Sequence, residues 1–96
     1  MSVYFIALID IHDRAGYQRY LDGFDAVFER FNGEVLAVDE DPTILEGRWP
    51  AARTVVIRFP EEDDLLRWYR SPEYQALARL RATASSGAIA VVHGTD

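Results

Sequence analysis

The sequence predicts a single α+β domain in which strands and helices follow the order β-α-β-β-α-β. Three observations support this prediction. The chain has 96 residues, which is enough for one domain and too few for two. Four short apolar runs alternate with two segments whose apolar residues recur every three or four positions, the spacing of one helix face. No linker, repeat or low-complexity tract interrupts the pattern, so residues 1–96 are expected to form one domain.

The first half of the chain predicts a strand, a helix and a second strand. Residues 3–11 form an almost unbroken apolar run, rich in β-branched and aromatic residues, which is typical of a strand. Asp13 is expected to cap the next helix, because its carboxylate can accept a hydrogen bond from an unpaired backbone N–H. Asn32 and Gly33 predict a left-handed end to that helix, and residues 34–40 predict the second strand. The apolar stripe of the helix comprises Tyr17, Tyr20, Leu21, Phe24, Val27, Phe28 and Phe31.

The second half of the chain predicts a strand, a helical region and a last strand. Residues 54–59 form the third apolar run. A helical segment follows it, with acidic residues at its start, where the helix dipole favours negative charge. Ser71 and Pro72 begin a further helix, with the serine as cap and the proline at the first helical position. Gly87 is expected to break that helix, and residues 88–93 predict the last strand.

The predicted sheet is apolar on both of its faces. Along the first strand, two sets of side chains point to opposite faces: Val3, Phe5, Ala7, Ile9 and Ile11 to one, and Tyr4, Ile6 and Leu8 to the other. An antiparallel sheet with one wet face normally alternates polar with apolar residues. Since two helices can cover only one face of the sheet, the second face is predicted to pack against a second copy of the chain, giving a homodimer.

Composition and charge exclude several classes of protein. The net charge of −6 argues against nucleic acid as a partner. No apolar run of about 18 residues could span a bilayer and the start lacks a secretory pattern, so no membrane partner and a cytoplasmic location are expected. The chain has no cysteine, its two histidines have no metal-ligand spacing, and it has no Gly-rich phosphate loop. We therefore expect neither a metal nor a cofactor.

Several motifs resemble those of a known family. They are Leu45-Glu46-Gly47, Phe59-Pro60 and Trp68-Tyr69-x-Ser71-Pro72-Glu73-Tyr74-Gln75, together with Asp13, Tyr17, Tyr20, Arg53 and Arg81. In these residues the chain resembles the bacterial domain-of-unknown-function 1330 family over nearly its whole length. The resemblance implies a dimeric α/β barrel, in which ferredoxin-like subunits with four-stranded antiparallel sheets pack sheet to sheet. It implies no particular biochemical role.

The predicted topology gathers polar and aromatic residues at one end of the sheet. The first strand ends there, the loop between the second and third strands lies there, and the last helix runs back to the same end. An arginine side chain suits a bidentate grip on a carboxylate or phosphate, and a histidine can change charge near neutral pH. The predicted ligand-binding residues are Asp10, Glu46, Trp49, Arg53, Trp68 and Arg81, and the predicted catalytic residues are His12 and Tyr74.

The same residues also have a structural interpretation. The two arginines would then pair with Asp10 or Glu46, because partly buried charges need partners. His12 would be an exposed loop residue, and Trp68 and Tyr74 would be core residues at helical spacing.

Two functions therefore remain open. In the first, the chain binds or converts a small anionic or aromatic metabolite without a metal cofactor, in a pocket between the sheet and its helices. In the second, it is a non-catalytic dimeric binding or regulatory module with no cavity above about 300 Å³, the lower limit for typical ligand pockets. A cavity that joins Arg53, Arg81 and an aromatic residue would favour the first function.

Overall fold

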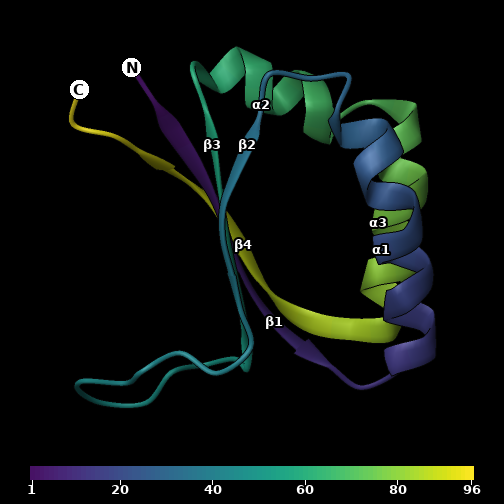
Figure 1. Ribbon diagram of the computed structural model, residues 1–96, viewed down its shortest axis with the longest axis vertical. Helices are drawn as coiled ribbons and strands as arrows, with labels where there is room; N and C mark the ends of the chain where they lie inside the picture. The colour runs from purple at the N-terminus through teal and green to yellow at the C-terminus, as the bar shows by residue number, and fades with distance from the viewer.

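A computed structural model describes residues 1–96, which form four strands and three helices. In chain order the elements are β1 (Val3–Ile11), α1 (Arg14–Phe28), β2 (Glu34–Asp39), β3 (Arg53–Phe59), α2 (Glu62–Tyr69), α3 (Pro72–Ala84) and β4 (Ser85–His93). The strands pair in the order β2-β3-β1-β4, and every neighbouring pair is antiparallel. All three helices lie on one side of the sheet (Figure 1). The predicted ferredoxin-like fold class is confirmed.

The helix-facing side of the sheet forms the core. Four alternate residues of β1 are only 2–4% exposed: Val3, Phe5, Ala7 and Ile9. Trp68 of α2 and Tyr74 of α3 are 0% exposed, and the ring of Trp68 stacks on that of Phe59 with 5.5 Å between centroids. The intervening residues of β1 are half-buried and point to the other side. The predicted division of β1 into two apolar faces is therefore correct.

The two predicted helix caps are present. The carboxylate of Asp13 accepts a hydrogen bond from the backbone N–H of Gly16, with 3.1 Å between the atoms. The hydroxyl of Ser71 accepts one from the backbone N–H of Tyr74 at 3.2 Å, and Pro72 is the first residue of α3. Each cap satisfies an N–H that the helix itself leaves unpaired.

The predicted left-handed end of α1 is wrong. The helix ends at Phe28, and Glu29 after it keeps a right-handed conformation. Gly33 lies in the turn before β2 and does not have a positive φ. A Cβ atom there would be 2.5 Å from the ring of Phe28 and 2.6 Å from that of Phe59. The residue must be glycine because two core rings occupy the space beside its backbone.

The role predicted for Gly87 is also wrong. Helix α3 ends at Ala84, and β4 starts at Ser85, three residues before the predicted strand. Gly87 lies inside β4, directly opposite Ile9 of β1. A Cβ atom on it would lie 2.0 Å from the carbonyl oxygen of Leu8. This glycine lets two paired strands approach closely, which is a property of the sheet and not of the helix end.

The second face of the sheet carries no helix. The loop of residues 40–52 between β2 and β3 extends away from the sheet on this side, opposite the helices (Figure 1). Leu45 in this loop is 91% exposed. No helix in the chain combines the length and the apolar character needed to cross a membrane.

We expect Gly87→Ala to lower the free energy of unfolding by about 2 kcal/mol, because the new methyl group meets backbone that cannot move without breaking the sheet. Urea denaturation followed by circular dichroism measures the change. Gly23→Ala is the matched control, since its nearest neighbour is the mobile end of the Leu77 side chain and alanine favours a helix. Equal stability of the two variants would contradict this account of Gly87.

Candidate functional site

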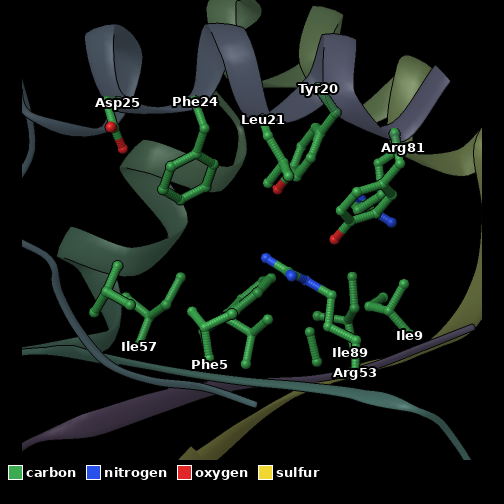
Figure 2. Close-up of a pocket in the computed structure, with 15 residues that line it drawn as sticks. Phe5, Ile9, Tyr20, Leu21, Phe24, Asp25, Arg53, Ile57, Arg81 and Ile89 are labelled. Atoms are coloured by element: carbon green, nitrogen blue, oxygen red, sulfur yellow. The ribbon is translucent and has the colours of Figure 1, made fainter. Parts of the chain in front are cut away.

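A cavity of about 390 Å³ lies between the sheet and the helix layer. Its walls come from β1, β2, β3 and β4 on one side and from α1 and α3 on the other (Figure 2). Of its 15 lining residues, 12 are hydrophobic: Phe5, Ala7, Ile9, Tyr17, Tyr20, Leu21, Phe24, Val35, Val38, Val55, Ile57 and Ile89, with Asp25, Arg53 and Arg81 as the polar members. A cavity of this size and composition is typical of a site for a small organic molecule.

Two arginines enter the cavity from opposite walls. Arg53 begins β3 and pairs in register with Ile9, whose side chain faces the helices, so Arg53 extends from the sheet into the space below them. Arg81 lies in the last turn of α3 and enters from the helix side, as Figure 2 shows. The guanidinium carbon of Arg53 is 5.3 Å from the ring centre of Tyr17. That of Arg81 is 5.9 Å from the ring centre of Tyr20. Aromatic faces therefore hold both cations.

Neither arginine has its hydrogen-bonding capacity filled. The Nε atoms of Arg53 and Arg81 are buried and have no hydrogen-bond partner. Arg53 donates through Nη1 to Glu40 at 2.7 Å, whereas Arg81 forms no ion pair. The proposed pairing of the arginines with Asp10 or Glu46 is thus wrong. Arg81 is half-buried and has no counter-ion, and partial burial of an unpaired charge is unfavourable, so this end of the cavity is suited to an anion.

Glu40 joins the cavity to the loop between β2 and β3. Besides Arg53, it accepts hydrogen bonds from Arg14 at 2.8 and 3.3 Å. The hydrogen bonds from the two guanidinium groups hold the pKa of Glu40 below its ordinary value. Glu40 is therefore charged and exposed. An anion bound in the cavity would compete with it for the guanidinium group of Arg53.

A pair of tyrosine hydroxyls lies beside Arg81. The hydroxyl oxygens of Tyr20 and Tyr74 are 2.8 Å apart and buried. Tyr20 lines the cavity, whereas Tyr74 lies behind it in the core. Burial raises the pKa of both phenols above the ordinary value of 10.0, although the charge of Arg81 acts in the opposite direction. Both tyrosines are therefore neutral hydroxyl groups at neutral pH.

Three of the predicted ligand-binding residues lie at the correct end of the sheet but outside the cavity. The side chain of Asp10 points to the opposite face of the sheet from that of Ile9, and its carboxylate accepts a hydrogen bond from the backbone N–H of Ala52 at 3.0 Å. The indole N–H of Trp49 donates to the hydroxyl of Thr54 on β3, and Glu46 is exposed in the loop. Strand alternation places Asp10 on the other face of the sheet from the two arginines, and the loop that carries Glu46 and Trp49 projects to the open side of the sheet.

Of the other predicted residues, only the two arginines line the cavity. Trp68, predicted to bind ligand, is buried in the core and does not line the cavity. Tyr74, predicted to be catalytic, does not line the cavity and is connected to it through its interactions with Tyr20 and Arg81. His12 is exposed and also lies outside. Of the eight predicted site residues, the structure places Arg53 and Arg81 in the cavity wall.

The sequence interpretation missed most of the cavity wall. Tyr17, Tyr20 and Phe24 belong to the apolar stripe of α1, which predicts burial against the sheet and nothing more. The signal available was the presence of two tyrosines in that stripe, because a buried hydroxyl needs a partner. Val35 and Val38 of the exposed strand β2 complete the open rim of the cavity. Whether Val35 and Val38 line the cavity depends on the distance between β2 and α1, and a local sequence pattern does not predict that distance.

The fold and the cavity together define a ferredoxin-like α+β protein with a small-molecule-sized site. The family model described as "Domain of unknown function (DUF1330)" matches residues 2–95. The chain belongs to this family, as its motifs predicted. No match was found among the curated proteins.

Solved structures of the same fold include proteins of different description. The RPA0582 protein of unknown function from Rhodopseudomonas palustris is similar with a TM-score of 0.78 and 16% identity, over 99% of this chain and 83% of that one. SnoaB, a cofactor-independent oxygenase from Streptomyces nogalater, has a TM-score of 0.67 and 18% identity, over 99% and 94%. A dimeric ferredoxin-like protein of unknown function from Bacteroides fragilis has a TM-score of 0.64 and 15% identity, over 97% and 96%. At these identities the similarity establishes the fold alone.

We expect the stability of the protein to fall as the pH rises above about 10. In the unfolded chain a tyrosine loses its proton near the ordinary pKa of 10.0, whereas burial raises the pKa of Tyr20 in the folded protein. The contribution of Tyr20 to the free energy of unfolding is therefore fully present below about pH 10 and is lost progressively as the pH rises above it. Thermal unfolding at a series of alkaline pH values measures the slope.

Tyr20→Phe is expected to make this slope shallower, because it removes one of the two buried phenols. Tyr4→Phe, on the opposite side of the sheet, removes a hydroxyl outside the pair and serves as the control. A slope that is the same in Tyr20→Phe as in the unsubstituted protein would show that Tyr20 does not contribute to it.

Proposed function

We propose that the cavity binds a small amphipathic anion, with its charged end between Arg53 and Arg81 and its apolar body along the sheet. The observation that carries this proposal is the pair of partly buried guanidinium groups, each with a buried and unpartnered Nε, in a cavity whose other walls are almost entirely apolar. An anion would supply the missing acceptors and the missing negative charge. Planar guanidinium groups bind carboxylate and other oxyanions with two parallel hydrogen bonds.

The charge distribution supports an anionic ligand over a neutral one. Arg81 has no carboxylate within ion-pair distance, and the single carboxylate paired with Arg53 is exposed and shared with Arg14. Only Asp25 among the lining residues carries a negative charge. The positive charge at the arginine end therefore exceeds the negative charge near it, even though the whole chain carries a net charge of −6.

The size of the cavity supports this function over the non-catalytic module. At about 390 Å³ it exceeds the limit of about 300 Å³ below which ligand pockets are uncommon. One structure of the same fold is described as a cofactor-independent oxygenase. That description supports extending the proposal to conversion of the bound molecule without a metal or a cofactor, as an analogy at the level of the fold.

We expect the protein to bind 4-nitrobenzoate at least about tenfold more tightly than its neutral analogue 4-nitrobenzamide, because only the carboxylate satisfies the two guanidinium groups. Isothermal titration calorimetry measures both affinities. Arg81→Gln is expected to remove most of the preference, and Arg67→Gln is the matched control, since Arg67 is exposed on α2 and pairs with Asp64. Absence of 4-nitrobenzoate binding, or binding that Arg81→Gln leaves unchanged, would refute the proposal.

Glu40→Gln provides a change in the opposite direction. It removes the carboxylate that competes for Arg53, so the affinity for 4-nitrobenzoate is expected to rise in the same titration. A loss of affinity in this variant would mean that Glu40 supports the site instead of competing with the ligand.

We further propose that the chain acts as a homodimer through the open face of the sheet. The apolar residues on this face are Tyr4, Ile6, Leu8, Val56, Ala88, Ala90 and Val92. No helix covers them, and a structure of the same fold is described as dimeric. The loop of residues 40–52 extends on this side and presents Leu45, so a second copy would meet both the sheet and the loop.

Ala90→Arg is expected to convert the dimer to a monomer, because it introduces a charge at the centre of this face, next to Ile6. Ala90 is exposed in the subunit, so the variant should fold normally. Analytical ultracentrifugation measures the oligomeric state, with Leu80→Arg on the outer surface of α3 as the control. A monomeric unsubstituted protein at micromolar concentration would rule out the dimer.

A further inference from the structure

We infer that Tyr20 is the hydroxyl that donates a hydrogen bond to an oxyanion in the cavity, and that the site takes a phenol or enol, which it holds as the conjugate base beside Arg81. This inference rests on the proposed function, since it requires that an anion binds at the arginine end. It names the chemical class of that anion.

The hydrogen-bond partners of the tyrosine pair determine which proton is free. Tyr74 is 0% exposed, and its hydroxyl interacts with two groups: the hydroxyl of Tyr20 at 2.8 Å and the guanidinium group of Arg81, which can only donate. A buried hydroxyl that donates to nothing is unfavourable, so Tyr74 donates to the oxygen of Tyr20. The O–H of Tyr20 is then not used within the pair. Because Tyr20 lines the cavity, this proton is available to a bound molecule.

Arg81 supports the same orientation. Its positive charge acts on both hydroxyls, and its guanidinium carbon lies 5.9 Å from the ring centre of Tyr20. Because the guanidinium group of Arg81 faces the oxygen of Tyr74, the hydrogen of Tyr74 points away from Arg81 and toward Tyr20. Burial also raises the pKa of Tyr20, so this residue remains a donor and does not become a base. Tyr74 and Arg81 are thus positioning residues for Tyr20, and Arg81 in addition supplies charge to the ligand.

Tyr20 and the two arginines would have the largest effect on the ionisation of a weakly acidic ligand. A carboxylic acid is already ionised at neutral pH, whereas a phenol or an enol is mostly protonated. A neutral donor and two guanidinium groups in an apolar cavity stabilise the charged form, which lowers the pKa of the bound hydroxyl. The ligand O–H bond breaks, the electron pair stays on the oxygen, and the proton leaves to water at the rim, where Asp25, Val35 and Val38 are exposed. The resulting oxyanion accepts from Tyr20.

The test uses 4-nitrophenol, whose conjugate base absorbs visible light, so that absorbance reads the ionisation of the bound molecule directly. We expect the protein to lower the pKa of bound 4-nitrophenol relative to the free compound. Tyr20→Phe is expected to reverse about one pKa unit of this shift, which corresponds to one hydrogen bond to a charged group. Tyr74→Phe is expected to reverse a smaller part, because Tyr20 keeps its hydroxyl but loses the partner that orients it.

The controls separate this inference from the proposed function. Tyr4→Phe removes a hydroxyl on the other side of the sheet and should leave the shift unchanged. Tyr17→Phe removes the other tyrosine hydroxyl of the cavity wall, and loss of the shift there with retention in Tyr20→Phe would overturn the inference. If 4-nitrobenzoate binds in an Arg81-dependent way but Tyr20→Phe leaves the pKa of bound 4-nitrophenol unchanged, the proposed function stands and this inference fails. If 4-nitrobenzoate does not bind, the proposed function itself fails.

Discussion

The structure depends on the central position of β1 between β3 and β4, with both of its faces apolar. The register of this strand assigns each neighbouring residue to a side of the sheet: because Ile9 faces the helices, its partner Arg53 does as well, whereas Asp10 does not. A slip of one residue would exchange the two sides and remove Arg53 from the cavity. Burial of Val3, Phe5, Ala7 and Ile9 against the helices holds that register, and the three helices leave the other face of the sheet uncovered.

The helix layer closes the core at one end and leaves a cavity at the other. At the α2 end, the rings of Trp68, Phe59 and Phe28 pack against one another and fill the space between the layers. Around the cavity, the sheet also contributes smaller side chains, such as those of Ala7, Val55 and Ile89. The difference in side-chain volume along one sheet therefore produces both a well-packed core and a binding site.

The electrostatic character of the cavity arises from local pairing and not from the charge of the chain. An acidic protein holds two arginines in an apolar space, where one has an exposed, shared partner and the other has none. The tyrosine pair adds a neutral donor next to the unpaired cation. A fold by itself does not specify a reaction, so any specificity must come from the side chains in the cavity.

The sequence by itself determined the order of elements, the bounds of β1, the two side-chain caps and the family, because each depends on residues that are adjacent or one helical turn apart. It also brought Arg53 and Arg81 to one end of the fold through topology alone. Only the tertiary structure decided that Arg53 pairs with Glu40, that Gly33 and Gly87 make room for distant groups, and that the loop carrying Trp49 turns away from the cavity. Those outcomes depend on distances between segments far apart in the chain, and a linear pattern contains no record of such distances.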